Sequence, residues 1–574
     1  MSTPFAQRLL TAHDLFRFVL VDDPQVSPDG REVAWVRTWL DEEQNGYRAQ
    51  ICITEIASGA TRQLTDGPGQ DTHPRWSPDG QAIAYLASPG AAARDEHDDA
   101  PQNPVSVARG GTQLMLVAAA GGPAQRLTDL LGGVRAPAWS PDGGRIAFLT
   151  YVDPAVGLEF VSGPELDEED PYVRFNRDVL VVNRLRWKWD NIGYLGNYRS
   201  HVAYVDVPVF GDGSAAIAST PAPILVTQGE FDLSAPVWSP GGRTLATTGN
   251  LDPGGEALRN SYIYLLDLAE DAPIAPRKLF GLEEMRSNDL AWSPDGATLA
   301  VCGHDDPVIG HYGNQMLWLV SVDDGTATCV TRDFDRALGD YSRNYDLRRY
   351  GGDDGPRWLP DGEQLYVLIN EAGSVDLGVV DATTGAVSTL TAGRHSVFAF
   401  SMDQTAETLV LSIGDDMNPG DLFVLEQDDT GQAALRQLTD VNRTLLDDIV
   451  MTEPIRFEAP SGDVVIDSWL IPPVNREPGK RYPVILYTGG GPGGMRASVF
   501  SHEFHLYAAN GYALLHCNTR GNHGYGEEFS VATRGRWGDL DYEDNMASLR
   551  TALARFDFLD PERLAVAGGS YGGY

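Results

Sequence analysis

The residues with the clearest capacity for chemistry lie in the run Leu-Ala-Val-Ala-Gly-Gly-Ser-Tyr-Gly-Gly-Tyr at residues 564–574. Gly568, Ser570 and Gly572 form the pattern Gly-x-Ser-x-Gly, and the apolar residues before them predict a short buried strand. A serine on a sharp strand-to-helix turn projects its hydroxyl away from the backbone, and glycines tolerate the close contacts beside it. We therefore expect Ser570 to be a nucleophile, with the backbone N–H of Tyr571 directed at an oxyanion. The alternative is a glycine-rich turn without chemistry.

Length and composition limit the classes of protein to consider. A chain of 574 residues is too long for one core and predicts two or more domains. The 81 acidic against 43 basic residues give a net charge of −38, which argues against nucleic acid or an anionic membrane surface as a partner. The four cysteines are too far apart for a disulfide framework or a zinc site, and we expect no cofactor. No signal-peptide core or membrane-length apolar run occurs, so we expect a cytoplasmic protein.

A repeated turn organises the chain before residue 445. Copies of Ser-Pro-Asp-Gly or close variants, most of them preceded by tryptophan, begin at Ser27, Trp76, Trp139, Trp238, Trp292, Trp358 and Phe400. Proline presets the φ angle of such a turn and glycine takes its left-handed position, so each copy joins two strands. Units of about four strands at these intervals predict a seven-bladed β-propeller over residues 21–445, in preference to a solenoid or a sandwich. The tryptophans should then occupy equivalent buried positions between neighbouring blades.

The two flanks of this region have different patterns. Residues 1–20 predict a short helical segment in which Thr11 could be the N-cap. In residues 446–574 strands alternate with helices: strands are expected at 482–487, 512–517 and 564–567, and an amphipathic helix at 541–556. Such alternation is typical of a parallel sheet covered on both faces.

A propeller followed by a serine turn resembles the prolyl oligopeptidase family of serine peptidases, and within it the acylaminoacyl peptidase (acylpeptide hydrolase) branch is most similar. The resemblance is carried by the repeats and by residues 10–15, 489–492, 518–526, 537–544, 560–563 and 568–574. It implies an N-terminal propeller, a C-terminal α/β-hydrolase domain on which residues 1–20 pack, an acyl-enzyme on Ser570, and oxyanion donors at Tyr571 and Gly491. Family members usually have His-Gly-Gly-Pro where this chain has Gly489-Gly-Gly-Pro, and three consecutive glycines lose more entropy on ordering.

The other members of a catalytic triad are not found among these motifs. In α/β-hydrolases the order is serine, acid, histidine, so both partners of Ser570 would follow Tyr574. The histidines of the hydrolase portion all precede the serine and are interpreted as loop or sheet-edge residues: His502, His505, His516 and His523. We therefore expect a hydrolase domain truncated after the nucleophile turn and inactive by itself, with the C-terminal segment supplied by the same or a separate chain.

Three functions remain open from the sequence. The first is a serine peptidase acting on short peptides, possibly N-acylated, with the propeller restricting substrate size. The second is a catalytically dead propeller protein that acts as a binding module. The third is an esterase, which would share the serine turn but leave the propeller unexplained. A homo-oligomer is compatible with each of them.

Overall fold

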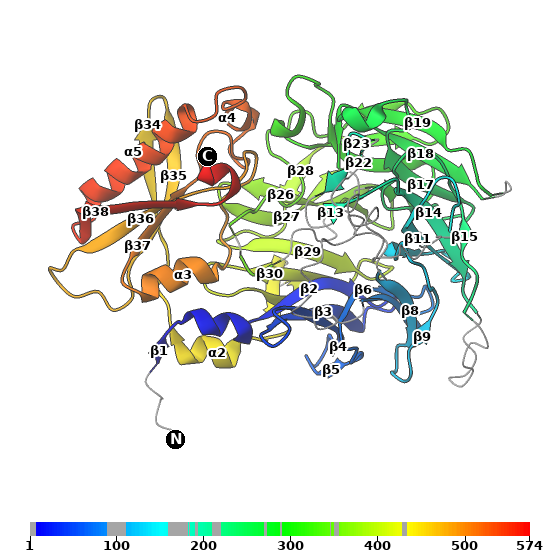
Figure 1. Ribbon diagram of the computed structural model, residues 1–574, viewed down its shortest axis with the longest axis horizontal. Helices are drawn as coiled ribbons and strands as arrows, with labels where there is room; N and C mark the ends of the chain where they lie inside the picture. The colour runs from blue at the N-terminus through cyan, green and yellow to red at the C-terminus, as the bar shows by residue number, and fades with distance from the viewer. Residues whose placement is uncertain are drawn as a thin grey trace, which may run out of the picture.

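The computed structural model describes residues 7–88, 111–158, 182, 184–189, 193–208, 220–268, 272–286, 290–344, 346–348, 355–427 and 433–574. Figure 1 shows a larger all-β part beside a smaller part in which helices flank a sheet, with the N-terminal segment below the smaller part. In the described part of the chain, no helix combines the length and apolar character needed to cross a membrane.

The all-β part consists of antiparallel units that follow one another along the chain. The first four units are β2 (Val19–Val26), β3 (Glu32–Asp41), β4 (Gly46–Glu55) and β5 (Thr61–Gln63); β6 (Gln70–Trp76), β7 (Ala82–Ser88), β8 (Gln113–Ala118) and β9 (Gln125–Arg126); β10 (Arg135–Trp139), β11 (Arg145–Val152), β14 (Arg199–Asp206) and β15 (Ile224–Leu225); and β16 (Val237–Trp238), β17 (Thr244–Gly249), β18 (Ser261–Asp267) and β19 (Arg277–Leu282). A small hairpin, β12 (Lys188–Trp189) and β13 (Gly193–Tyr194), lies between β11 and β14 in the sequence.

The later units continue this arrangement. They are β20 (Glu284–Met285), β21 (Ala291–Trp292), β22 (Thr298–His304), β23 (Met316–Ser321) and β24 (Ala327–Cys329); β25 (Arg357–Trp358), β26 (Gln364–Glu371), β27 (Ser374–Asp381) and β28 (Val387–Thr389); and β29 (Ser396–Met402), β30 (Leu409–Gly414), β31 (Asp421–Gln427) and β32 (Ala433–Gln437). The short 3-10 helices η3 (Gly255–Ala257) and η4 (Gly310–Tyr312) lie in loops.

The repeated turns join the first two strands of their units, and their tryptophans link neighbouring units. The indole N–H of each donates to a backbone carbonyl of the preceding unit, at 2.8 to 3.2 Å, in the pairs Trp76–Gln25, Trp139–Arg75, Trp238–Ala138, Trp292–Val237 and Trp358–Ala291. The positions are therefore equivalent, as predicted, but only Trp238 and Trp358 are buried, whereas the other three are half-buried.

The first unit packs against the last, so the units form a ring. The backbone N–H of Val26 in β2 donates to Ser401 Oγ at 3.0 Å, and Ser412 Oγ donates to the carbonyl of Val21 at 2.9 Å. Their apolar side chains share one core cluster, which includes Val21 and Val410. A ring of antiparallel sheets is the architecture of a β-propeller, in which radial repetition protects the strand edges.

The N-terminal segment begins with a strand and ends its helical stretch earlier than predicted. Strand β1 (Arg8–Leu9) pairs in parallel with β33 (Ile449–Val450). A 3-10 helix, η1 (Ala12–Arg17), follows, with a capping box between Thr11 and Asp14. The predicted helix to residue 20 is wrong in its last residues, because pairing with β3 places Val19 and its neighbours in β2.

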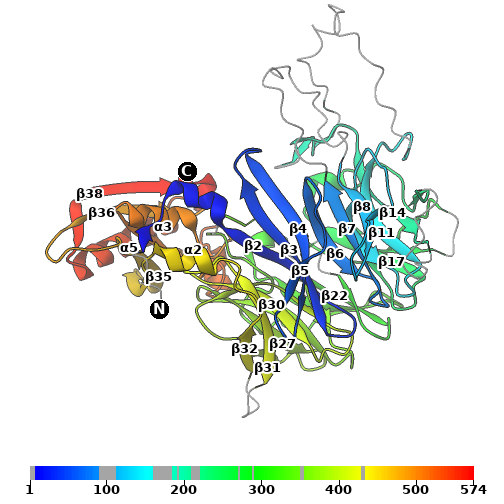
Figure 2. The same ribbon diagram turned by 90° about the horizontal axis from the view of Figure 1, so that it is seen from below.

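This segment contacts the smaller part of the molecule as well as the propeller. The ring of Phe18 lies 4.9 Å from that of Phe500, and a ring nitrogen of His502 lies 3.1 Å from the carbonyl oxygen of Thr11. Leu20 and Leu347, from the propeller side, share the same core cluster. The segment therefore sits at the junction of the two parts (Figure 2).

The smaller part is a five-stranded sheet in the order β34-β35-β37-β36-β38. Its elements are β34 (Ile455–Ser461), β35 (Val464–Ile471), β36 (Tyr482–Thr488), β37 (Ala513–Cys517), β38 (Leu559–Gly568), α3 (His502–Ala509), α4 (Glu527–Val531), α5 (Leu540–Arg555) and the 3-10 helix η5 (Ser570–Gly573). Helix α2 (Arg443–Asp448) precedes β33, so the domain boundary expected at residue 446 falls inside a helix.

Helices cover both faces of this sheet, as the alternation predicted. Leu515 of β37 packs in the cluster that contains Leu549 of α5, and its neighbour Leu514 packs with Phe504 of α3. The predicted apolar face of α5 lies in the first of these clusters. Successive residues of β37 thus serve opposite layers, which explains the continuous apolar sequence of the strand.

Strands β36, β37 and β38 run parallel, as the alternation of strands and helices predicts, and the antiparallel hairpin of β34 and β35 precedes them. One expectation for this sheet needs correction. The strand before Ser570 is not buried: β38 is at the edge, paired only with β36, and leaves Leu564 45% and Val566 71% exposed. Figure 2 shows β38 along the outer edge of this part.

Candidate active site

Ser570 has the backbone conformation that a nucleophile turn requires. It is the first residue of η5, directly after β38 and Gly569, and its φ is +56°. A residue with a Cβ rarely adopts this left-handed conformation, which costs about 1–2 kcal/mol and persists only where the surroundings impose it. The predicted sharp turn is therefore present, with its strain located at the serine itself.

The two flanking glycines are required by close backbone contacts with Thr488. A Cβ built on Gly568 would overlap Thr488 Oγ1, and one built on Gly572 would overlap the carbonyl oxygen of Thr488. Thr488 Oγ1 lies 2.6 Å from the carbonyl oxygen of Gly572 and 3.2 Å from that of Ala567. Thr488 thus clamps the turn on both sides of Ser570. Sequence reasoning missed this residue, whose only signal is its position at the end of β36.

Tyr571, the expected source of an oxyanion N–H, is anchored through its ring. Its hydroxyl donates to Asp541 Oδ2 at 2.5 Å, and its ring lies edge-on to Trp537 at 5.3 Å. Burial, together with the Asp541 carboxylate, raises the pKa of the Tyr571 phenol above its usual range. The phenol therefore stays protonated and keeps donating, which holds the residue after Ser570 against the start of α5.

The glycine loop after β36 packs directly on the serine turn. A Cβ built on Gly490 would lie 3.4 Å from the carbonyl oxygen of Gly569 and 3.7 Å from Ser570 Cβ. Gly491 follows with a φ of +131°, a conformation that favours glycine. The N–H of Gly493 donates to the carbonyl of Gly521 at 2.9 Å, which fixes the far side of the loop. The structure thus brings residues 489–493 and Ser570 together, as the family resemblance implies.

The histidines of the smaller part contact residues other than Ser570. His502 contacts Thr11, as described above, and His505 Nε2 lies 2.7 Å from the carbonyl oxygen of Asp416. His516 stacks on Trp469, with 5.4 Å between ring centroids, and the ring of His523 lies 4.2 Å from that of Tyr341. Among the described residues, no histidine is hydrogen-bonded to Ser570. The prediction of loop or sheet-edge positions is correct for His523 only. His502 and His505 lie in α3 and His516 lies in β37, the middle strand of the sheet, where His505 and His516 stack on the aromatic rings of Phe500 and Trp469.

Three of these histidines should make the free energy of unfolding depend on pH. Burial lowers the pKa of His505 to about 4 and the pKa values of His516 and His523 to about 3. Below pH 6.5 these histidines bind protons in the unfolded chain but stay neutral in the native state. Each histidine therefore lowers the free energy of unfolding by about 1.4 kcal/mol per pH unit, down to its native pKa. Burial also raises the pKa of Asp416 to about 6, which offsets one histidine between pH 6 and 4.

Replacing His516 by phenylalanine isolates one of these contributions, because the aromatic contact with Trp469 can be kept. As the pH is lowered from 6.5 to 4.5, the urea midpoint of His516→Phe should rise relative to that of the wild-type chain. Equal slopes for the two proteins would contradict the assignment.

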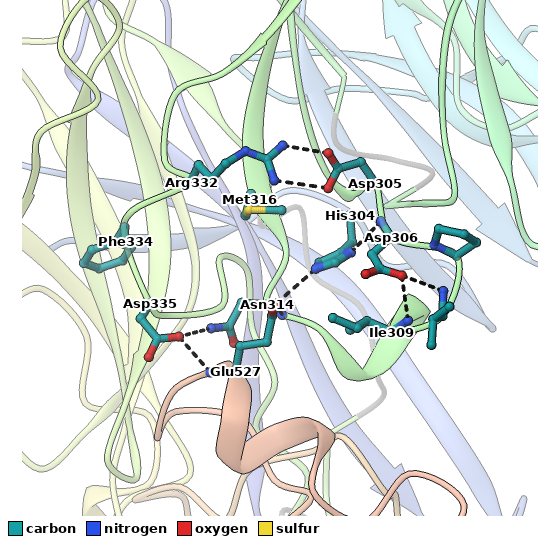
Figure 3. Close-up of a pocket in the computed structure, with 12 residues that line it drawn as sticks. His304, Asp305, Asp306, Ile309, Asn314, Met316, Arg332, Phe334, Asp335 and Glu527 are labelled. Carbon is teal, nitrogen blue, oxygen red and sulfur yellow. Dashed lines mark hydrogen bonds and ion pairs between the residues drawn. The ribbon is translucent and has the colours of Figure 1, made fainter.

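A pocket of about 760 Å³ lies at the junction of the propeller and α4 (Figure 3). Glu527 accepts from the backbone N–H of Asn314 at 3.0 Å and pairs with His304 Nε2 at 3.0 Å. Asp335 accepts from Asn314 Nδ2 at 3.0 Å and from the N–H of Glu527 at 2.7 Å. These contacts tie α4 to the propeller. In the part of the chain that the structure describes, no group of three or more His, Cys, Asp or Glu side chains is placed to hold a metal ion.

The pocket and the glycine loop lie on either side of η4. Ile309, directly before η4, lines the pocket, and the carbonyl oxygen of His311 lies 3.9 Å from where a Cβ of Gly493 would be. Ser530 Oγ of α4 donates to the carbonyl of Tyr312 at 2.7 Å. The pocket is therefore linked to the glycine loop through η4, and its lining combines charged residues with apolar ones such as Val308 and Phe334.

Comparison with known proteins agrees with this architecture. The model of the prolyl oligopeptidase family matches residues 498–574. Over 570 residues the chain is 31% identical to the uncharacterized peptidase YuxL of Bacillus subtilis (strain 168), an alignment that covers 99% of this chain and 79% of that relative. It is 22% identical over 565 residues to dipeptidyl-peptidase 5 of Porphyromonas gingivalis, covering 96% and 74% of the two chains.

Among solved structures, the Pyrococcus horikoshii acylaminoacyl peptidase matches with a TM-score of 0.72 at 22% identity, over 99% of this chain and 76% of that one. This likeness concerns the fold, a propeller joined to an α/β-hydrolase domain. The serine turn, the fold and the 31% identity to a peptidase over nearly the whole chain lead to one assignment. The chain belongs to the prolyl oligopeptidase family of serine peptidases.

Proposed function

We propose that this peptidase cleaves short peptides, N-acylated ones among them, through an acyl-enzyme formed on Ser570. The observation that carries the proposal is the left-handed conformation of Ser570, with φ at +56°, beside the Gly490 loop. Strain of this kind concentrates at functional sites, and here it exposes a hydroxyl at the end of a parallel strand.

In the proposed reaction Ser570 Oγ attacks the carbonyl carbon of the scissile peptide bond. The carbonyl oxygen becomes an oxyanion that accepts hydrogen bonds from the backbone N–H groups of Tyr571 and Gly491. A general base takes the Oγ proton and passes it to the departing amine, and a water molecule then releases the acid product from the serine. Oxyanion donors that are in position before the reaction stabilise the transition state without having to reorganise, and this lowers the barrier.

We further propose that the units of the all-β part are seven blades and that this ring limits access to Ser570. Support comes from a continuous seam between the two parts. The N–H of Met495 donates to the carbonyl of Tyr341 at 2.7 Å, and that of Arg343 donates to the carbonyl of Met495 at 3.0 Å. The Asn344 amide exchanges two bonds of 2.9 Å with the backbone of Ala497. This seam holds the propeller against the segment that follows the glycine loop, which supports a role of the propeller in limiting substrate size.

Substrate size is the direct test of that proposal. The full-length enzyme should hydrolyse a blocked peptide of a few residues but leave the same sequence intact inside a folded protein, with the two reactions compared by mass spectrometry. The same protein after denaturation serves as the control for sequence preference. Rapid cleavage of the folded substrate would contradict a restricting propeller, and turnover of esters without peptides would favour the esterase alternative.

A protein limited to residues 1–574 should show little peptidase activity. Since none of the described histidines is bonded to Ser570, we expect only the rate that oxyanion stabilisation and binding supply, roughly 10³- to 10⁴-fold above the uncatalysed reaction. Activity would be measured on a monodisperse sample whose mass is 62.3 kDa. Full peptidase activity in that sample would mean that a histidine of this chain moves to the serine.

A further inference from the structure

We propose that Arg496 is a positioning residue that holds the Gly490–Gly491 peptide in the orientation needed for an oxyanion donor. This inference rests on the proposed function, because it assigns Arg496 a role through the N–H of Gly491. The family resemblance left one question at this loop: what stiffens three consecutive glycines where relatives usually have a histidine.

The space of the absent side chain at position 489 is occupied by an arginine. A Cβ built on Gly489 would overlap the guanidinium group of Arg496, meeting its Nη2, Cζ and Nε atoms. Arg496 is only 3% exposed, so this group is enclosed by protein. A residue with a side chain at position 489 would therefore not fit while Arg496 occupies this space.

The guanidinium acts on the peptide unit that supplies the proposed donor. Arg496 Nη2 donates to the carbonyl oxygen of Gly490 at 3.3 Å. That carbonyl and the N–H of Gly491 belong to one trans peptide unit, so they point in opposite directions. Holding the carbonyl of Gly490 on the guanidinium side consequently turns the N–H of Gly491 to the other side. The orientation of the donor is set by a contact that the substrate never touches.

Arg496 is itself held on two sides. Its backbone N–H donates to Asn518 Oδ1 at 2.7 Å, and Asn518 Nδ2 donates to its carbonyl at 2.8 Å. Its Nη1 donates to the carbonyl of Arg343 in the propeller at 3.0 Å. Asn518 is fully buried, so these bonds are shielded from water. The planar fork of arginine reaches Gly490 and Arg343 together, which a lysine ammonium on one flexible stem would do less well.

A double-mutant cycle on Gly489 and Arg496 in the full-length enzyme tests this assignment. Arg496→Ala should lower kcat about 10- to 100-fold while KM changes less than about threefold, because a displaced donor weakens stabilisation of the transition state and not of the bound substrate. Arg496→Lys should recover part of kcat. Gly489→Ala should lower kcat in the wild-type background, since its Cβ meets the guanidinium. In the Arg496→Ala background the same change should cost little, because the space is then open.

The controls separate this inference from the proposed function. The exposed Arg31, in the first repeat turn, gives a matched variant, Arg31→Ala, that should keep the wild-type kcat. Thermal unfolding of each variant shows whether it folds, and if Arg496→Ala does not, Arg496→Lys and Gly489→Ala still carry the test. An unchanged kcat for these variants, or additive effects across the cycle, overturns the role of Arg496. Retained activity in Ser570→Ala would instead overturn the proposed function.

Discussion

Replacement of Ser570 by alanine is expected to remove peptide and ester hydrolysis together, lowering kcat by about 10⁴- to 10⁶-fold. The reason is that the hydroxyl is the only group of Ser570 that can form the acyl-enzyme, while the oxyanion donors can stabilise an attack by water only weakly. Both substrate classes share this step, so their losses should match. The measurement is steady-state turnover of a short peptide and of an ester on the full-length enzyme.

The fold should survive this replacement. Alanine differs from Ser570 by one oxygen atom, and no hydrogen bond of the described residues depends on that hydroxyl. Thermal unfolding and chromatographic behaviour should therefore equal those of the wild type. More than about 1% of the wild-type rate in a folded Ser570→Ala protein would contradict the assignment of the nucleophile.

Replacement of Asp544 by alanine is expected to lower the free energy of unfolding by about 3 kcal/mol, because the buried guanidinium of Arg520 loses its hydrogen-bonded carboxylate and keeps only the more distant Asp463 and Glu543, at 3.9 and 3.8 Å. Asp544 is fully buried in α5. It accepts from Arg520 Nη2 at 2.7 Å and from the backbone N–H of Arg520 at 2.8 Å, and it also accepts from Ser461 Oγ at 2.7 Å. One carboxylate thus joins α5, the loop after β37 and the hairpin of β34 and β35.

Ser461→Ala is the matched control for this prediction, since it removes one bond to the same carboxylate without exposing a charge. It should cost only about 1 kcal/mol. Urea unfolding of the three proteins provides the comparison. Equal destabilisation by the two replacements would show that the ion pair with Arg520 contributes little beyond its hydrogen bonds.

Local features of the fold could be predicted from the sequence because their determinants are close together. The serine turn, the apolar face of α5 and the positions of the repeated tryptophans each follow from a few neighbouring residues. The end of η1 could not be predicted, since the apolar spacing of residues 15–20 suits a helix while pairing with β3 makes Val19 part of a strand. Tertiary pairing overrides local propensity there.

Parts of the active site could not be predicted from the sequence because they depend on long-range contacts. Arg496 explains Gly489, but the link needs the loop to fold back over seven positions and the propeller to supply the carbonyl of Arg343. The clamp of Thr488 on Gly572 likewise joins residues that only the parallel sheet brings together. The exposure of Leu564 depends on which strands neighbour β38, which its own apolar sequence does not encode.

The most direct test of the central claim is the site of reaction with a serine-directed fluorophosphonate. The full-length enzyme would be labelled, digested and mapped by mass spectrometry while peptidase activity is followed in parallel. We expect one label per chain, on Ser570, with labelling and loss of activity proceeding at the same rate. Loss of activity with the label on another residue, or full activity with Ser570 labelled, would contradict the claim that this serine is the nucleophile.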